Sequence, residues 1–349
     1  MDNNELMGRI EKLEEENKSL KTWQQDVMNL LSGILQMAED QKKNNENVES
    51  QIATIYRMSK INRYRVDSLP YEIAAPDYNV DIFYPSIMSL EDTRKAVIDD
   101  RKSIARLGDG EFSAIAGVKR WNFQGESKEL GLRLREILSS DVDNLLVGLN
   151  PNFYGSLQGL EENDADGVRA YMRPEVRRLH SELLRKEVLY ADALFHRISS
   201  EDDLTELRRL WKGRDVVIVE GQYTRMGIGN DLLNDAKSIR RILAPSESAF
   251  SRYDDILEAA KKQPKDSLFL IALGPTATVL AYDLAKAGYW AVDIGHLDLI
   301  FEKFKRGLDS LYDVDISFKY CNRDEQGERR QIEDIKDDVY ESQIVERVL

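Results

Sequence analysis

Residues 268–294 read LFLIALGPTATVLAYDLAKAGYWAVDI, and this stretch decides the fold. Two apolar runs, Leu268–Leu273 and Trp290–Ile294, flank a helical pattern over Val279–Ala287. Runs that are apolar throughout, rather than alternating with polar residues, are typical of strands buried on both faces of a sheet. The order strand, helix, strand therefore predicts a parallel pair of strands joined by a helix that covers the sheet.

The same alternation extends through most of the preceding chain. Further apolar runs predict strands at Ser103–Leu107, Asn144–Leu149, Val188–Phe195, Val216–Glu220 and Ile239–Ala244. Helices are predicted at Ser89–Asp100, with Ser89 as the N-cap, and at Lys128–Ser140. The sequence thus predicts an α/β fold with a mostly parallel sheet and helices on both faces. In such sheets ligands bind in the loops at the carboxyl ends of the strands.

Composition excludes several classes of protein. With 42% hydrophobic residues, the 349-residue chain is not wholly disordered. Its 49 Lys and Arg against 63 Asp and Glu give a net charge of −14, which argues against a nucleic-acid partner. The single cysteine, Cys321, rules out an internal disulfide or a thiolate metal site. No signal peptide and no membrane-spanning run is visible, so we expect a cytoplasmic protein without a transmembrane segment.

The first 60 residues contain no proline and follow a heptad pattern. One phase holds over seven heptads, with a and d positions at Leu6, Ile10, Leu13, Asn17, Leu20, Gln24, Val27, Leu31, Ile34, Ala38, Gln41, Asn45, Val48, Ile52 and Ile55. A helix packed on a globular domain would drift by about 20° per heptad from this seam, so a coiled coil is predicted. Polar a positions such as Asn17 favour a parallel dimer, although a trimer and a solvated helix lying on its own domain remain alternatives.

Four loops after predicted strands carry unusual residues. In the first, Asp109 and Glu111 flank Gly110 directly after a buried strand. Carboxylates at this spacing can share a hard divalent cation such as Mg²⁺ or Mn²⁺, which could then hold a diphosphate. The alternative is a polar Asp-Gly turn exposed to solvent.

The second loop, Glu220–Asp231, crowds three glycines, Arg225, Asn230 and Asp231 between a strand and a helix. Its backbone N–H groups and guanidinium could bind phosphates, or its glycines could simply shape a loop. The third loop contains Gly274, Pro275 and Thr276 at a helix N-terminus, where free N–H groups and the helix dipole favour an anion. Neither loop matches the dinucleotide or Walker A pattern.

The fourth loop contains His296, Asp298 and Glu302. These residues could provide a general base, bind a hydroxyl or ligate a metal, whereas a lone histidine is more often structural. His180 lies in a charged helical stretch, which predicts a surface position.

Together these segments resemble the GT-D-type glycosyltransferase family, a bacterial group first noted as a domain of unknown function. The resemblance spans roughly residues 85–322 and is carried by SIARLGDGEF (103–112), WKGRDVVIVEGQYTRMGIGNDLL (211–233), RRILAPSESAF (240–250) and LGPTATVLAYDLAKAGYWAVDIGHLDLIFEKF (273–304). It implies a Rossmann-like α/β transferase whose D-x-E motif, here Asp109 and Glu111, binds a divalent metal, often Mn²⁺. It also implies a UDP-sugar donor, typically UDP-glucose, and an acceptor glycan on a bacterial surface glycoprotein such as a serine-rich-repeat adhesin.

On this basis we expect four parts and a defined set of site residues. The parts are a coiled-coil helix (1–60), a linker with Pro70 and Pro76 (61–84), a GT-D-type domain (85–322) and a C-terminal helical extension (323–349). The catalytic candidates are Arg225, which would neutralise the leaving group, and His296, Asp298 and Glu302. The candidates for binding the donor and the metal are Arg106, Gly108, Asp109, Glu111, Glu220, Asn230, Asp231, Gly274, Pro275 and Thr276, with Asp109 and Glu111 as metal ligands.

Two other functions fit the same patterns. A coiled-coil adaptor could carry an α/β domain that binds a nucleotide or sugar-phosphate without turnover. A nicotinamide-dependent Rossmann enzyme is the third possibility, and the imperfect glycine pattern counts against it.

Overall fold

The computed structural model describes residues 3–72, 84–117, 125, 127–155, 157, 160–320 and 332–349. The chain divides into two units, residues 1–67 and 68–349. Each unit is described by itself below. Cys321 and residues 73–83 of the predicted linker lie outside the described residues.

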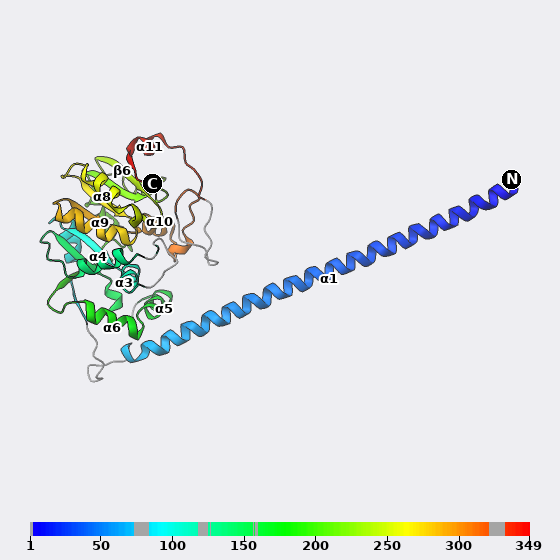
Figure 1. The fold of residues 1–349 in the computed structure, drawn as a ribbon, viewed down its shortest axis with the longest axis horizontal. Helices are drawn as coiled ribbons and strands as arrows, with labels where there is room; N and C mark the ends of the chain where they lie inside the picture. The colour runs from blue at the N-terminus through cyan, green and yellow to red at the C-terminus, as the bar shows by residue number, and fades with distance from the viewer. Residues whose placement is uncertain are drawn as a thin grey trace. The chain divides into compact units, whose positions relative to one another are not determined.

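The N-terminal unit consists of one helix, α1 (Asn3–Glu72), drawn in blue in Figure 1. Its predicted seam carries apolar side chains such as Leu31, Ile34 and Ile52, which are 49%, 55% and 61% exposed. The predicted helix is therefore present, and pairing along the seam stays a prediction. The helix continues past residue 61, where the linker was predicted to begin, since no proline interrupts it before Pro70.

The second unit is built on a nine-stranded sheet with the order β1-β4-β3-β2-β8-β7-β5-β6-β9. Neighbouring strands pair in parallel throughout, as predicted. The strands are β1 (Ser86–Ile87), β2 (Ser103–Leu107), β3 (Leu145–Leu149), β4 (Leu189–Asp192), β5 (Asp215–Gly221), β6 (Ser238–Ala244), β7 (Leu268–Ala272), β8 (Trp290–Asp293) and β9 (Ile344–Arg347).

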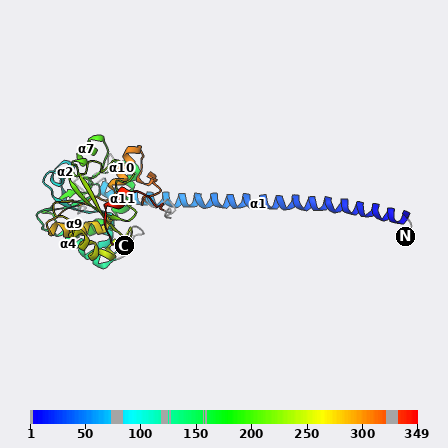
Figure 2. The same ribbon diagram turned by 90° about the horizontal axis from the view of Figure 1, so that it is seen from above.

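Helices cover both faces of this sheet, and Figure 2 shows α4 and α9 on one side and α2, α7 and α10 on the other. The α-helices of this unit are α2 (Leu90–Ile98), α3 (Asp109–Ile115), α4 (Lys128–Leu138), α5 (Glu162–Tyr171), α6 (Pro174–Leu183), α7 (Glu201–Arg208), α8 (Tyr253–Lys261), α9 (Pro275–Lys286), α10 (Leu297–Arg306) and α11 (Asp338–Gln343). Short 3₁₀ helices occupy Pro151–Phe153, Ala249–Arg252 and Leu311–Asp313. Ser89 caps α2 by accepting a hydrogen bond from the Asp92 backbone N–H, as predicted.

Strand β5 shows why the predicted strands are apolar throughout. Val217 and Val219 belong to the core on the α4–α9 side of the sheet, whereas Val216 and Ile218 belong to the core on the α2–α10 side. Because successive side chains point to opposite faces, a strand buried on both faces has no polar alternation. This confirms the predicted architecture.

The C-terminal segment differs from the predicted helical extension. After the short helix α11, residues Ile344–Arg347 form β9 and pair with β6 at the edge of the sheet. This strand is mostly exposed and lacks an apolar run, so its sequence carries no strand pattern. Among the described residues, no helix combines the length and apolar character needed to cross a membrane.

Candidate active site

A cavity of about 460 Å³ opens at the carboxyl ends of the parallel strands. The four loops singled out in the sequence and the loop after β3 each contribute to its wall, for example through Asp109, Thr224, Gly274, His296 and Asn150. Residues separated by up to 214 positions in the chain, from Arg106 to Tyr320, thus meet at one edge of the sheet. This is where parallel α/β sheets bind their ligands.

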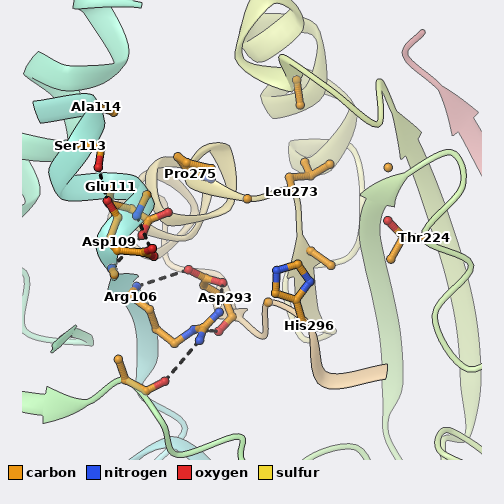
Figure 3. A pocket seen from close by; sticks show the side chains of 18 of the residues that line it. Arg106, Asp109, Glu111, Ser113, Ala114, Thr224, Leu273, Pro275, Asp293 and His296 are labelled. Carbon is orange, nitrogen blue, oxygen red and sulfur yellow. Dashed lines mark hydrogen bonds and ion pairs between the residues drawn. The ribbon is translucent and has the colours of Figure 1, made fainter. Parts of the chain in front are cut away.

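The acidic motif follows β2 and forms the first turn of α3. Gly108 is the N-cap of this helix, and its N–H donates to Oε2 of Glu111 at 2.7 Å. Asp109 is exposed toward the cavity, and its Oδ1 accepts from the Gly110 N–H at 3.0 Å. The fold therefore presents both carboxylates at the cavity wall (Figure 3).

The electrostatics of this motif favour a cation. Burial, together with the nearby carboxylates of Asp293 and Asp109, raises the pKa of Glu111 to about 7. Within the described part of the chain, no group of three or more His, Cys, Asp or Glu side chains is arranged to hold a metal ion. The residues fit a hard divalent cation that takes two protein carboxylates and fills its remaining positions with phosphate oxygens and water. They do not form a complete cage of protein ligands.

Arg106 is the guanidinium that the fold directs into the cavity. Its Nε donates to the Asp293 carbonyl at 2.8 Å, and its Nη2 donates to Oδ1 of Asp293 at 2.9 Å (Figure 3). Its Nη1 lies 3.2 Å from the Ala193 carbonyl oxygen, to which it donates. Gly295 has a φ of +54°, and a Cβ there would lie 2.1 Å from Nη2 of Arg106, so glycine is needed for this arrangement.

Further cationic and imidazole groups gather beside Arg106. His196 is buried, and both of its ring nitrogens lie within 3.3 Å of Nη1 of Arg106. His296 faces the cavity, and its pKa is lowered to about 4 by burial and by the positive charges of Arg106 and Arg197. Its imidazole is therefore neutral at pH 7. This concentration of positive charge suits an anionic ligand.

In the glycine-rich loop after β5, Arg225 and Glu220 make structural contacts and, contrary to the prediction, do not reach the cavity. Arg225 donates to the carbonyls of Phe318 and Glu333, both at 2.7 Å, and does not line the cavity. Glu220 is fully buried in an ion pair with Arg241 at 2.6 Å. These contacts tie the loop to the C-terminal segment and to β6.

Asn230 and Asp231 also lie outside the cavity wall. Asn230 donates to Asp298 and Glu302, whereas Asp231 pairs with Arg208. Gly221 and Thr224 are the residues of this loop that reach the cavity.

The loop that contains His296, Asp298 and Glu302 also has some residues that line the cavity and others that do not. Asp298 lines the cavity, but its two oxygens accept from the Gly227 N–H, from Asn230 and from the buried ammonium of Lys319 at 2.6 Å. Glu302 is buried away from the cavity and accepts from Asn230 and Arg306. Of the proposed bases, His296 and Asp298 face the cavity, and the carboxylate of Asp298 is committed to the ion pair with Lys319.

Helix α9 begins at the centre of the cavity. Gly274 is its N-cap with a φ of +56°, and Gly274 and Pro275 line the wall. Thr276 is fully buried and does not reach the cavity. Thr278 donates its hydroxyl to the Arg106 carbonyl at 2.9 Å, which fixes α9 against β2.

Besides the residues that lie outside the cavity, sequence reasoning missed part of the site and placed His180 wrongly. His196 and Arg197 come four and five residues after the end of β4, so the same rule about strand ends would have found them. Ser246, within the segment RRILAPSESAF (240–250), and Tyr320, which no motif marks, also line the cavity. His180 was predicted on the surface but is 1% exposed, since α6 packs it against Phe112 of α3 with ring centroids 3.8 Å apart.

Comparison with known proteins identifies related sequences and folds. A family model described as glycosyltransferase GT-D fold matches residues 104–324. The probable glycosyl transferase Gly of Streptococcus gordonii is 34% identical over 270 residues, which are 74% of this chain and 38% of that protein. The glycosyltransferase GlyD of Streptococcus pneumoniae serotype 4 is 32% identical over 278 residues, 75% of this chain and 32% of that protein.

Two solved structures share the fold. A structure of the domain of unknown function 1792, described as a distinct glycosyltransferase fold, has a TM-score of 0.69 and 30% identity over 75% of this chain and 95% of that one. A glycosyltransferase of the same group from Streptococcus sanguinis has a TM-score of 0.69 and 33% identity over 76% of this chain and 100% of that one. The two relatives compared by sequence are much longer proteins, of which this chain spans about a third.

Proposed function

Because this chain belongs to the family of glycosyltransferases with the GT-D fold, we propose that it transfers a hexose from a UDP-sugar to a hydroxyl group of a bacterial glycan or glycoprotein. Glucose is the sugar that the family resemblance favours. The single observation that carries the proposal is the cavity in which Asp109 and Glu111 face Arg106 and His296 across the carboxyl ends of β2 and β8.

The acidic pair and the guanidinium have complementary tasks. Asp109 and Glu111 would hold Mn²⁺ or Mg²⁺, which would supply positive charge to the diphosphate of the donor. Arg106 would stabilise the negative charge that develops on the leaving diphosphate. It replaces Arg225 in this role, since Arg225 is committed to two backbone carbonyls outside the cavity. Its bonds to Asp293 hold it in place before the substrate binds.

His296 is our candidate for the base that accepts the proton of the acceptor hydroxyl. Its imidazole is neutral at pH 7, and the cations that lower its pKa are those that a bound diphosphate would neutralise. Donor binding would therefore raise the basicity of His296 at the moment when the acceptor arrives. Asp298 is engaged with Lys319 and is better suited to positioning the loop around it.

The helix α1 would join two copies of the enzyme. Its exposed apolar seam is the feature of the N-terminal unit that a second, parallel copy would bury. A dimer carries two active sites, which increases avidity for a repetitive acceptor when the geometry allows both to engage. We place the enzyme in the cytoplasm, where nucleotide sugars are made.

Calorimetry with UDP-glucose and other nucleotide sugars, with and without Mn²⁺, tests donor binding, and sugar transfer to a glycan acceptor tests turnover. We expect Asp109→Ala to abolish metal-dependent binding and transfer. Asp254→Ala is the matched control, since Asp254 is an exposed aspartate in the first turn of α8 and does not line the cavity. Full activity of folded Asp109→Ala would refute the proposal, and binding without turnover would favour the adaptor.

A further inference from the structure

Arg94 on α2 is a buried arginine that does not line the cavity but holds part of its wall. Its Nε donates to the carbonyl of Phe195 at 2.9 Å, and its Nη2 donates to the carbonyl of Arg197 at 2.8 Å. These two carbonyls flank His196, whose side chain faces the cavity. One guanidinium therefore holds the chain on both sides of His196.

The guanidinium of Arg94 is itself fixed by two carboxylates of α7. Its Nη1 donates to Asp203 at 2.6 Å and to Glu206 at 3.0 Å. A guanidinium carries five N–H donors in a rigid planar fork, so it can bind two carbonyls and two carboxylates at once. The ammonium group of a lysine is a compact charge without this fork. Arg94 thus ties α2 and α7 to the segment that follows β4.

Residues 193–197 form the surface against which the guanidinium of Arg106 rests. Nη1 of Arg106 donates to the Ala193 carbonyl at 3.2 Å and lies 3.2 and 3.3 Å from the two ring nitrogens of His196. Burial and the charge of Arg106 hold the pKa of His196 well below its ordinary value, so the ring is neutral and one nitrogen can accept from Nη1. Asp293 holds Nε and Nη2, and residues 193–197 hold Nη1.

Close packing couples this segment to Arg106. Phe195 is fully buried in the same core cluster as Val97 of α2, which anchors the middle of the segment. A Cβ at Gly148 of β3 would lie 3.3 Å from Cα of Ala193 and 3.4 Å from Cγ of Arg106, so a glycine lets the two approach each other. A shift of the segment is therefore passed on to the guanidinium.

Building on the proposed function, we propose that Arg94 is a positioning residue, which through residues 193–197 holds Arg106 where negative charge develops on the leaving diphosphate. Arg94 does not line the cavity, so it acts through this segment alone. A donor that is already in place when the charge develops needs no reorganisation in the transition state. A misplacement of about 1 Å caused by a change remote from the chemistry can lower a rate about 100-fold.

The first test is kinetic and uses the whole chain with UDP-glucose, Mn²⁺ and a glycan acceptor. Arg94→Lys keeps the charge beside α7 but cannot span both carbonyls. We expect kcat to fall about tenfold and KM for UDP-glucose to change less than about twofold, because the misplaced group acts on charge that develops only in the transition state. The matched control is Val97→Ala, which destabilises α2 without removing a hydrogen bond to the segment and should leave kcat unchanged.

A double-mutant cycle separates positioning from a general loss of structure. Arg106→Ala should lower kcat at least about 100-fold, because it removes the guanidinium. Arg94→Lys should then have no further effect on kcat in the Arg106→Ala background. A purely structural effect would lower kcat by the same factor in both backgrounds. His196→Leu should also lower kcat only when Arg106 is present, and His196→Asn, which keeps a hydrogen-bond acceptor, should lower it less.

The crystal structure of Arg94→Lys tests the same contacts without turnover, and we expect Nη1 of Arg106 to leave hydrogen-bonding distance of the Ala193 carbonyl. An unmoved Arg106, or equal losses of kcat in both backgrounds, overturns the positioning role. If Arg94→Lys does not fold, the His196 variants decide by the same cycle. Wild-type protein that transfers no sugar overturns the proposed function instead, and the crystal structure still decides what holds Arg106.

Discussion

Acid should destabilise this protein through His180, which supports the helix that carries the acidic motif. Its Nδ1 lies 2.8 Å from the hydroxyl of Tyr154, and its Nε2 lies 3.1 Å from that of Tyr171. Its ring stacks on Phe112, one residue after Glu111. Burial, together with the charge of Arg177, lowers the pKa of His180 from 6.5 to about 3. Protonation therefore requires this packing to open.

The sign and size of the change in the free energy of unfolding follow from the linkage between proton binding and folding. A folded pKa below the unfolded value means that the contribution of His180 to stability is complete above pH 6.5 and is lost as the pH falls toward 3. Between pH 7 and pH 5 the unfolded chain takes up most of one proton at His180, whereas His180 in the folded chain stays neutral. At 1.36 kcal/mol per pKa unit, the free energy of unfolding decreases by roughly 2 kcal/mol over this interval.

The pH dependence of the wild-type free energy of unfolding does not by itself isolate the contribution of His180, because Glu111 acts in the opposite direction. Its raised folded pKa of about 7 means that protonation of Glu111 between pH 7 and pH 5 favours the folded state. The assay is therefore urea unfolding of wild type and His180→Gln at both pH values, followed by near-ultraviolet circular dichroism. We expect the wild type to lose roughly 2 kcal/mol more than His180→Gln on acidification. Equal losses in the two proteins would show that His180 is not buried in its neutral form.

Three further perturbations test the site and the N-terminal helix. Gly295→Ala should reduce kcat/KM at least tenfold by displacing the guanidinium beside it, whereas Gly307→Ala, which has a similar φ of +63° but nothing within 4 Å, should leave kcat/KM unchanged. Lys319→Met should cost roughly 3 kcal/mol or more in urea unfolding, since it leaves a buried carboxylate unpaired, and adding Asp298→Asn should restore part of that loss. If the proposed coiled-coil dimer forms, Ile52→Glu in the heptad seam should convert it to a monomer in light scattering without changing kcat, and an unchanged mass would contradict the coiled coil.

The strands that could be predicted from the sequence are those whose residues are apolar throughout, because both faces of these strands are buried. Val216–Glu220 is apolar throughout because both of its faces meet a helical layer. Strand β9 has one exposed edge and no such run, so only its pairing with β6 reveals it. His180 illustrates the same limit for a side chain, since charged neighbours surround it in sequence while Phe112 and Tyr154 bury it in space.

The two arginines show what distinguishes a guanidinium in the site from one in the scaffold. Arg225 has the more suggestive sequence, among glycines after a strand, yet it is held by carbonyls 93 and 108 residues away, which no local pattern encodes. Arg106 lies within β2, where its paired residue on β3 is Gly148 and its neighbour after β8 is Gly295. A Cβ at Gly148 would lie 3.4 Å from Cγ of Arg106, and one at Gly295 would collide with the guanidinium. A glycine on the flanking strand β3 and another just after β8 leave room for a long side chain near the end of a buried strand. That arrangement, rather than a glycine-rich loop, marks the cation at the site.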